Sequence, residues 1–371
     1  MWRVIIGLFL SVFAAGYVYI SFKSAKSGFV MKLAGGRRWL ARLLCVLFYA
    51  LLTLVLALLL NLMNALVCIL HFVLFRLICD FIGAVIIKIR RRKPRMRLSG
   101  VIAAVLCAAY LTAGWFAANN VRQTEYKLKS EKLSSDLRIV QITDAHLGTS
   151  LDADEFLTQI KRINKLKPDI VAVTGDFVDD STTKSDMLGG CAALGKLKTK
   201  YGVYFVYGNH DRGYSDEKLK GWKNEELRRA LEENGVITLE DEYSLIGGSF
   251  YVVGRKDRSA EQTGGGRKSA GALLDGLDKE KFTVILDHQP HDFDAEAHAC
   301  ADLVLCGHTH GGQFIPINRV GELIGENCLC YGYERRQTTD FIVSSGIGSW
   351  AFKFKTGCFS EYTVIDIKSE K

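Results

Sequence analysis

Five short segments of this chain carry residue types that bind divalent metal ions. In chain order they are Asp144-Ala145-His146, Gly175-Asp176, Gly208-Asn209-His210-Asp211, His288 and Gly307-His308-Thr309-His310. Five of the eight histidines of the chain fall in these segments. Carboxylate, amide and imidazole ligands without a thiolate suit manganese, iron or zinc. The pattern predicts two divalent ions and hydrolysis at a two-metal site.

Most of these segments directly follow an apolar run that is predicted to be a β-strand. The runs are residues 139–143, 171–174, 204–207 and 303–306. In α/β folds, the loops at the carboxyl ends of strands collect the ligands. The glycines at positions 175, 208 and 307 allow the backbone to turn sharply there. We therefore expect the five segments to converge on one point.

The pattern of residues 137–371 favours a sheet-rich α/β sandwich. It begins with a strand at 137–143, a helix at 152–166 and a strand at 170–174, which form a βαβ unit. Further strands are expected at 203–207, 250–253, 282–286, 303–306, 341–344 and 362–367, and helices near 184–199, 223–234 and 291–299. Strands and helices alternate at first, and strands then dominate.

In these motifs the chain resembles the calcineurin-like metallophosphoesterases. It looks most like their membrane-anchored bacterial branch, in which the last motif continues as Gly-His-Thr-His-Gly-Gly-Gln, here residues 307–313. The resemblance covers about residues 137–367. It implies a four-layer αββα sandwich with a dinuclear metal site at the sheet edge, and it says little about the substrate.

The resemblance also implies which residues hold the ions. The first ion would be bound by Asp144, His146 and His310, the second by Asn209, His288 and His308, and both by the bridging carboxylate of Asp176. His291 is a rival to His288, but the family pattern places the ligand before an x-Pro step, here Gln289-Pro290. Asp179 is expected to support the site without binding metal.

Two further residues would take part in the chemistry. Two ions roughly 3.5–4 Å apart lower the pKa of a bridging water, and the resulting hydroxide attacks phosphorus in line. His210 would face the leaving group and stabilise or protonate it. Asp211 would orient His210 through a hydrogen bond. The alternative for His210 is a packing residue outside the metal shell.

The first 120 residues are too apolar for a soluble domain and predict about four transmembrane helices. The expected spans are residues 4–22, 39–60, 65–87 and 101–118, with a break at Asn61 and Asn64. Alternatives are one long helix over 39–87 and a cleaved signal peptide at the first span. Residues 121–136 are polar and suggest a linker that leads to the catalytic domain, 137–371.

The basic residues near the spans predict the orientation of the chain. The loops 23–38 and 88–98 are both rich in Lys and Arg, and four spans place them on one side. That side is expected to be the cytoplasm. The chain is then a multi-pass protein of the cell membrane, and its catalytic half lies on the extracytoplasmic side.

The distribution of charged residues along the chain limits the classes of substrate that are expected. Residues 1–120 hold 15 basic residues and one acid, a net charge of +14, whereas the whole chain carries +8, so residues 121–371 carry −6. An anionic catalytic half does not favour a nucleic-acid partner. We expect a membrane-anchored phosphoesterase that hydrolyses a phosphomonoester or phosphodiester, lipid-linked or from the cell envelope, next to the bilayer. The alternatives are a nucleotide phosphodiesterase or nuclease, and a non-catalytic membrane receptor that retains the metal site.

Several features stay open. Arg76 and Asp80 in the third span form either an ion pair that fixes helix packing or a polar site. In the Gly-rich segment 254–271, Arg255 or Arg258 could touch a phosphate, or the segment is a solvated loop. Residues 349–359 alternate aromatic and basic side chains, which suits lipid headgroups or a buried hairpin with outward lysines. The redox state of the cysteines is left open.

Overall fold

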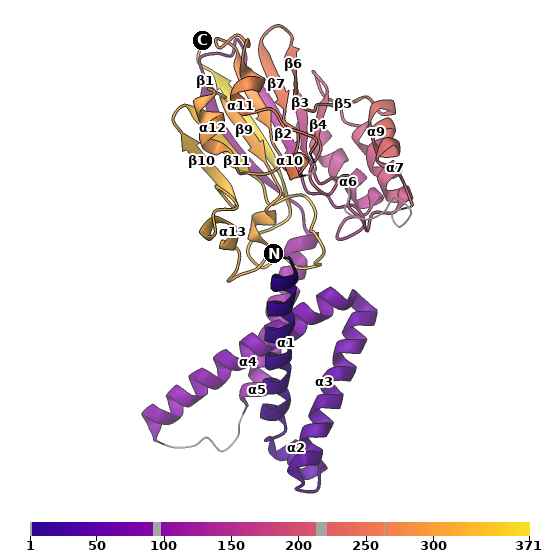
Figure 1. The fold of residues 1–371 in the computed structure, drawn as a ribbon, viewed down its shortest axis with the longest axis vertical. Coiled ribbons are helices and arrows are strands. Elements are labelled where there is room, and N and C mark those ends of the chain that lie inside the picture. Colours follow the sequence, from indigo (N-terminus) through magenta and orange to yellow (C-terminus); the bar gives the residue numbers. More distant parts are fainter. Residues whose placement is uncertain (1, 92–97, 213–220, 263) are drawn as a thin grey trace. The chain divides into compact units, whose positions relative to one another are not determined.

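The computed structural model describes residues 2–91, 98–212, 221–262 and 264–371. The chain forms two compact units, Met1–Gly114 and Trp115–Lys371. We call them the helical unit and the two-sheet unit and describe each by itself (Figure 1). All ten cysteines are free thiols.

The helical unit contains four long apolar helices and one short helix among the described residues. The long helices are α1 (Trp2–Ser24), α3 (Arg38–Leu60), α4 (Leu62–Arg90) and α5 (Ser99–Asn119), and the short one is α2 (Gly28–Leu33). Helix α5 continues into the two-sheet unit. Among the described residues, α3, α4 and α5 are long and apolar enough to cross a membrane. The apolar part of α1, Phe9–Ser24, is shorter than these three helices and is not counted as a candidate span. The described part of the chain therefore holds three candidate spans where four were predicted.

The break that was predicted near Asn61 is present. Asn61 has a positive φ of 94°, and its side-chain oxygen accepts a hydrogen bond from the backbone N–H of Asn64 at 3.0 Å. With a ψ of 165° this conformation is rare outside glycine, and the Asn61 side chain begins the next helix as its cap. Residues 39–87 are thus two helices and not one. Most of the basic loop 88–98 lies outside the described residues.

Asp80 collects polar partners from three helices of this unit. Its carboxylate lies 3.2 Å from Arg76 Nε and 3.3 Å from Lys23 Nζ. Tyr19 and Ser99 also donate hydrogen bonds to it, at 2.7 and 2.8 Å. A charge between apolar helices needs such partners. The contacts agree with a packing role, the first of the two interpretations above.

The two-sheet unit contains two six-stranded sheets. The first has the order β1-β12-β2-β3-β4-β5, and the second has the order β10-β11-β9-β8-β7-β6. The strands of the first sheet are β1 (Arg122–Ser130), β2 (Leu137–Ile142), β3 (Ile170–Thr174), β4 (Val203–Val206), β5 (Val236–Thr238) and β12 (Glu361–Ser369). Those of the second are β6 (Glu242–Ile246), β7 (Phe250–Gly254), β8 (Phe282–Leu286), β9 (Leu303–Cys306), β10 (Gly332–Arg336) and β11 (Thr339–Val343).

Strand β1 differs from the expectation for residues 121–136. The segment was expected to be a linker, but residues 122–130 pair in parallel with β12 over their whole length. Its side chains alternate between exposed and half-buried positions, and Tyr126 and Leu128 lie on the inner face. An edge strand that is mostly solvated needs few apolar residues, so composition alone did not reveal it.

Helices cover the outer faces of both sheets. Helices α6 (Ala153–Asn164), α7 (Lys184–Leu194) and α9 (Asn224–Glu233) share a buried core with the first sheet. Helices α11 (Ala270–Leu274) and α12 (Phe293–His298) do the same for the second sheet, and a third core lies between the sheets. The four-layer αββα sandwich is confirmed (Figure 1).

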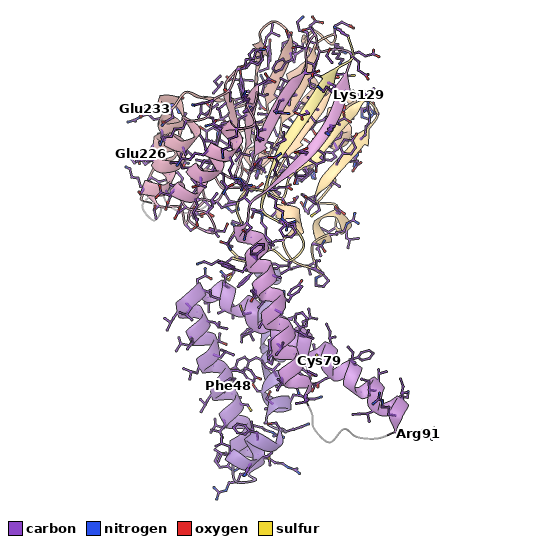
Figure 2. The ribbon with its side chains drawn as sticks, turned by 180° about the vertical axis from the view of Figure 1, so that it is seen from behind. Phe48, Cys79, Arg91, Lys129, Glu226 and Glu233 are labelled. Carbon is purple, nitrogen blue, oxygen red and sulfur yellow. The ribbon has the colours of Figure 1, made fainter. Side chains whose placement is uncertain are left out.

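The local sequence explains why these elements form. Strands β3, β8 and β9 are buried along their whole length, as expected of parallel strands that are covered on both faces. Helix α6 begins with a capping box between Asp152 and Glu155. Helix α9 buries an apolar stripe and keeps charges such as Glu233 on its outer face (Figure 2). The short segments α10 (Ser259–Gln262), η1 (His310–Gly312) and α13 (Val320–Leu323) lie in loops.

Candidate metal centre

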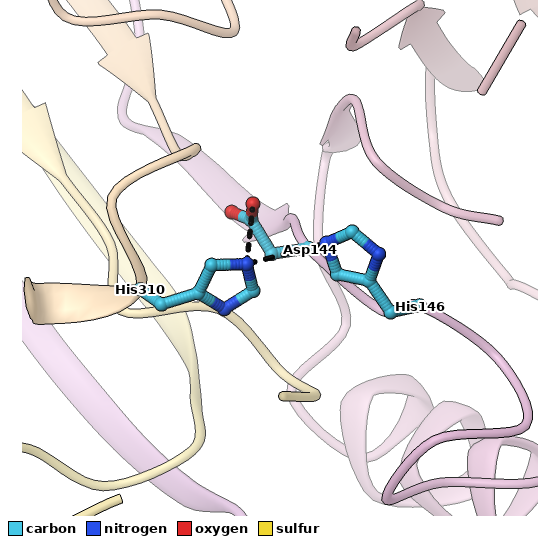
Figure 3. A group of neighbouring side chains, drawn as sticks. All are labelled: Asp144, His146 and His310. Carbon is cyan, nitrogen blue, oxygen red and sulfur yellow. Dashed lines mark hydrogen bonds and ion pairs between the residues drawn. The ribbon is translucent and has the colours of Figure 1, made fainter. Parts of the chain in front are cut away.

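The segments singled out in the sequence converge where strands of both sheets end. Asp144, Asp176 and His308 follow strands β2, β3 and β9. Two groups of three side chains each have one ligand atom apiece within 4.8 Å of the others: Asp144, His146 and His310, and Asp176, His288 and His308. Figure 3 shows the first group. These are six of the seven predicted ligands.

In the first group the side chains are aimed at a common point. His310 Nε2 lies 3.2 Å from His146 Nε2 and 3.5 Å from Asp144 Oδ1. Two nitrogens that bind one ion at about 2.1 Å lie roughly 3–3.5 Å apart. The other ring nitrogen of His146, Nδ1, bonds to Asp179 Oδ2 at 3.0 Å, so Nε2 is the atom left for a metal. Asp179 thus has the supporting position expected of it.

In the second group, a contact of the Nδ1 atom of His288 fixes the position of its ring. His288 Nδ1 contacts the carbonyl oxygen of Thr174 at 2.8 Å, and Nε2 lies 3.1 Å from Asp176 Oδ2 and 3.2 Å from Asn209 Oδ1. The seventh predicted ligand, Asn209, therefore lies beside this group. The rival His291 is directed elsewhere, since its Nδ1 contacts the backbone oxygen of Glu326 at 3.0 Å.

His308 supplies a test of whether these residues fit a metal. Its Nδ1 is buried and has no hydrogen-bond partner among the described residues. Burial and the nearby His288 lower the pKa of His308 to about 4, so the ring is neutral at pH 7 and its lone pair is available. A buried, unpaired ring nitrogen is costly unless something binds it. The donor set and this unpaired atom fit a divalent ion.

Asp176 belongs to the second group and also faces the first. Its Oδ2 is 3.1 Å from His288 Nε2 and 3.6 Å from His146 Nε2, so one carboxylate oxygen is near a histidine of each group. Burial alone would raise its pKa, but His288 and His146 hold the pKa of Asp176 well below its usual value. The carboxylate is therefore ionised, as a bridging ligand must be.

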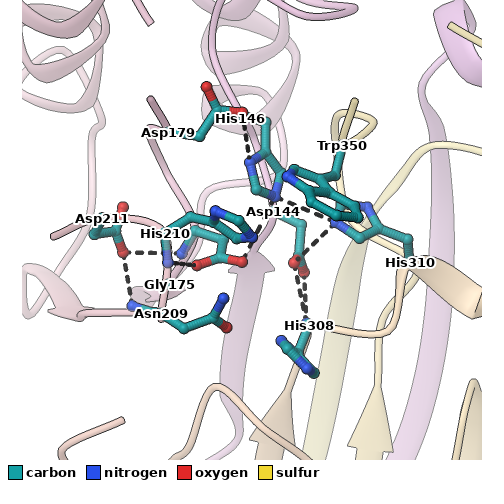
Figure 4. A network of polar contacts seen from close by, with 12 residues as sticks. Asp144, His146, Gly175, Asp179, Asn209, His210, Asp211, His308, His310 and Trp350 are labelled. Carbon is teal, nitrogen blue, oxygen red and sulfur yellow. Dashed lines mark hydrogen bonds and ion pairs between the residues drawn. The ribbon is translucent and has the colours of Figure 1, made fainter. Parts of the chain in front are cut away.

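The environment of Asp211 differs from the expectation. Its carboxylate accepts four backbone hydrogen bonds, from the N–H groups of Gly208, Asp176, Phe177 and Val178, at 2.7–3.1 Å. Each oxygen accepts two of these bonds, and Figure 4 shows Asp211 beside the loop of Asn209 and His210. Asp211 therefore joins the loop after β4 to the loop after β3, instead of the expected hydrogen bond that orients the His210 ring.

His210 lies over the first group and beside an aromatic ring. Its ring centroid is 5.2 Å from that of His146 and 5.2 Å from that of Trp350 (Figure 4). Its backbone N–H donates to Asp176 Oδ1 at 2.8 Å. Burial lowers the pKa of His210, so the ring is neutral at pH 7. Trp350 was not assigned to the site from the sequence, because its neighbours in the chain contain no ligand motif.

The ligand loops adopt an unusual backbone. Five of the predicted ligands have positive φ angles: Asp144, His146, Asp176, His308 and His310, from 39° to 69°. Such conformations are uncommon outside Gly and Asn and persist only where the surroundings enforce them. Of the three glycines that were expected to permit turns, Gly175 has a positive φ of 85°.

Gly208 and Gly307 are required for a different reason, which is space. A Cβ atom at Gly307 would lie 2.0 Å from Thr143 Oγ1, and one at Gly208 would lie 2.3 Å from Asp176 Oδ1. Only a residue without a side chain lets the ligand carboxylates pack against these loops. This requirement depends on segments that are distant in the sequence.

Neither interpretation of Arg255 from the sequence is correct. Its guanidinium is buried and contacts Asp287 at 2.8 Å, Glu296 at 3.0 Å and Asp292 at 3.0 Å. It is therefore neither a phosphate ligand nor solvated. Arg258, the other candidate, lies 3.5 Å from Glu326.

Lys355 is buried, whereas the sequence suggested that the lysines of residues 349–359 face lipid headgroups or solvent. Its side chain is fully buried, and Nζ donates to the backbone oxygens of Ser345 and Gly346 at 2.7 and 3.2 Å. Gly346 packs directly against Asp144. Lys355 therefore supports the backbone behind Asp144, a predicted metal ligand, and its side chain is not exposed to lipid headgroups or bulk solvent.

Comparison with known proteins agrees with the family resemblance seen in the sequence motifs. Residues 137–312 match the family model described as calcineurin-like phosphoesterase. An uncharacterized metallophosphoesterase of Bacillus subtilis is 30% identical over 236 residues, which cover 61% of this chain and 82% of that protein. A transmembrane protein with a metallophosphoesterase domain from Danio rerio is 27% identical over 282 residues, 72% of this chain and 62% of the relative.

Two further matches show the extent of the similarity. An uncharacterized metallophosphoesterase of Campylobacter jejuni is 27% identical over 240 residues, which cover 64% of this chain and 61% of that protein. The match thus spans less than two thirds of the Campylobacter and Danio relatives. The crystal structure of a dimetal phosphatase from Danio rerio aligns with a TM-score of 0.34 at 12% identity, over 56% of this chain and 86% of that one.

Proposed function

We infer the function from one premise: this chain belongs to the calcineurin-like phosphoesterase family, and we propose that it is a metal-dependent phosphoesterase. We propose that it uses two divalent ions to hydrolyse a phosphoester that is lipid-linked or part of the cell envelope. The observation that supports a dinuclear site is the pair of ligand groups, in which the Asp176 carboxylate of the second group also lies near His146 of the first.

The proposed residues divide into two sets of ligands. Asp144, His146 and His310 would hold one ion, and Asn209, His288 and His308 the other, with Asp176 shared. When bound, such ions activate a water molecule and neutralise phosphate oxygens. The absence of thiolates from the set suits manganese, iron or zinc.

The protein itself would act on the leaving group through His210. The ring is neutral at pH 7 because burial lowers its pKa, so it can donate an N–H hydrogen bond to the oxygen that leaves. Trp350 lies against this ring and is partly exposed. It would form an apolar wall where the leaving group sits. Asp211 is proposed to position the loops and not to contact substrate.

The membrane association supports a lipid-linked or envelope substrate. Three helices of the described residues are long and apolar enough to cross a bilayer, and two relatives are named as transmembrane proteins. A site held at a bilayer meets membrane-borne phosphoesters by proximity. Residues 121–371 carry a net charge of −6, which disfavours a nucleic-acid substrate.

The side of the membrane is a separate proposal. The basic loops of the helical unit favour the cytoplasm, so we propose that the two-sheet unit is extracytoplasmic. Protease added to intact cells should then cleave the two-sheet unit. Protection in intact cells with cleavage after lysis would reverse the orientation.

The central experiment measures hydrolysis by the full chain purified in detergent. An aryl phosphodiester and phosphorylated lipids are offered with added manganese, and metal content is measured in parallel. We expect metal-dependent turnover of the aryl ester and faster turnover of a lipid. Full turnover by Asp176→Ala would refute the two-ion mechanism, and faster turnover of a nucleotide than of any lipid would refute the substrate class.

A further inference from the structure

An apolar surface segment follows the last metal-ligand motif. Residues 315–324 read Ile-Pro-Ile-Asn-Arg-Val-Gly-Glu-Leu-Ile and include α13. The exposed large apolar side chains are Ile315, Ile317, Val320, Leu323 and Ile324, of which Leu323 is 83% and Ile324 67% exposed. One exposed apolar side chain is ordinary, but five within ten residues form a patch that indicates a binding surface.

This segment is held by the loop of residues 349–360. Gln313 Nε2 donates to the backbone oxygen of Phe354 at 3.2 Å, and the backbone oxygen of Gln313 accepts from the N–H of Thr356 at 2.8 Å. The N–H of Ile315 donates to Thr356 Oγ1 at 3.2 Å. The start of the apolar segment therefore has a defined position relative to this loop.

The same loop is bonded to the end of a candidate membrane helix. The N–H of Ser360 donates to the backbone oxygen of Ala117 at 3.0 Å, and its hydroxyl donates to that of Ala118 at 2.7 Å. These two alanines lie in the last turn of α5, which belongs to the two-sheet unit. A helix that crosses a bilayer ends at its surface. The hydrogen bonds thus connect the apolar segment to the place where α5 would leave the membrane.

The side chains around this place suit the interface of a bilayer. Trp115 and Phe116 are exposed in the last turns of α5. Phe359, next to Ser360, is also exposed, and the guanidinium of Arg122 lies 3.2 Å from the centre of its ring. Aromatic rings and cations are enriched where membrane proteins meet the lipid headgroups. The exposed apolar residues therefore have neighbours of the matching chemistry.

We propose that residues 315–324, with Trp115, Phe116 and Phe359, form a membrane-docking face that rests among the lipid headgroups. The occupant of this face is the surface of the bilayer that α5 enters, in which apolar side chains insert to a shallow depth. The inference rests on the proposed function and adds a route to it. The face begins five residues after His310, so a phosphoester on a lipid would reach the metal centre without leaving the membrane surface.

The test places a photoreactive side chain on the face. The full chain carrying Leu323→p-benzoylphenylalanine is reconstituted into nanodiscs of phosphatidylcholine and phosphatidylglycerol, irradiated and analysed by mass spectrometry. The matched control carries the same group in place of Leu245, an exposed leucine of β6, away from α13 (Figure 1). We expect lipid adducts at position 323 and few at position 245.

Two results would overturn the proposal. One is an equal yield of lipid adducts at the two positions, and the other is a cross-linked dimer at position 323, which would make the face a contact between copies of this chain. The readout needs no turnover, so it decides the docking even if the proposed activity is absent.

A second variant relates the face to catalysis. The double change Leu323→Ser and Ile324→Ser removes two apolar side chains and should lower turnover of a lipid phosphoester in proteoliposomes by roughly tenfold. Turnover of a soluble aryl phosphodiester should be unchanged, which also shows that the variant is folded. Equal turnover of the lipid by variant and wild type would contradict the proposed route.

Discussion

Replacing Asp211 by asparagine tests what holds the metal-ligand loops together. In the structure Oδ2 accepts from the N–H groups of Asp176 and Gly208, and Oδ1 accepts from those of Phe177 and Val178. All four donors belong to loops that carry predicted metal ligands. Asparagine preserves the shape of the side chain but replaces one oxygen by an NH₂ group, which cannot accept. The variant therefore isolates the contribution of these hydrogen bonds.

The expected effect follows from counting the bonds. Two of the four acceptor contacts are lost, and two buried N–H groups then face another donor. Burial and the nearby Asp176 raise the pKa of Asp211 to about 7, so the measurement is made at pH 8, where the carboxylate is mostly ionised. Hydrogen bonds to a charged acceptor contribute roughly 1.5–3 kcal/mol each, so Asp211→Asn should lower the free energy of unfolding by about 3–6 kcal/mol under this condition. Because the loops position Asp176 and Asn209, the affinity for added manganese should fall about 10–100-fold, as for other residues that support metal ligands.

The assay combines thermal unfolding with a metal titration of aryl phosphodiester hydrolysis, both on the full chain. The matched control is Asp241→Asn, since Asp241 also accepts two backbone N–H groups, those of Lys256 and Lys268. It should lower the unfolding temperature and leave the manganese dependence unchanged. Our reasoning would be refuted if Asp211→Asn kept the wild-type unfolding temperature and metal affinity while its pH–rate profile shifted. Asp211 would then act by orienting His210.

Three other outcomes are expected. Asp176→Ala should lose both bound metal and turnover, whereas His210→Ala should keep its metal, measured by elemental analysis, and lose about 100-fold or more in kcat. Gly307→Ala should lose most activity in the same assay, because its methyl group would lie 2.0 Å from Thr143 Oγ1. Burial raises the pKa of Glu296 from 4.5 to about 8. The folded protein therefore keeps a proton that the unfolded chain releases, and the free energy of unfolding should fall as the pH rises between these two values. Glu296→Gln should remove much of this fall, as measured by thermal unfolding at pH 6 and 8, and an unchanged fall would place the titration elsewhere.

The broad architecture could be predicted because its signals are local. Apolar runs marked most of the strands, and ligand-type residues directly followed four of them. Since the carboxyl ends of neighbouring parallel strands meet at one sheet edge, Asp144 and Asp176 had to approach each other. Once the strands were identified, pairing of β2 with β3 was enough to bring these two carboxylates together.

The contacts of charged residues could not be predicted, because they depend on partners far away in the chain. Arg255 lies in a Gly-rich, basic segment that suggested solvent or phosphate, yet it contacts acids that are 32 to 41 residues further on. Lys355 stands among aromatic residues that suggested a surface, yet it is buried behind Asp144. Nothing in the local pattern distinguishes a lysine that points inward from one that points outward.

The sequence by itself predicted a sheet-rich α/β unit, the types of the ligand residues, their order on successive strands, and the apolar helices that precede them. These depend on periodicity and composition, which act over a few residues. Only the tertiary structure decided that β1 joins the first sheet, that Asp211 joins two ligand loops, and that residues 315–324 are tied to the end of α5. Each of these depends on hydrogen bonds between segments that become neighbours only when the chain has folded.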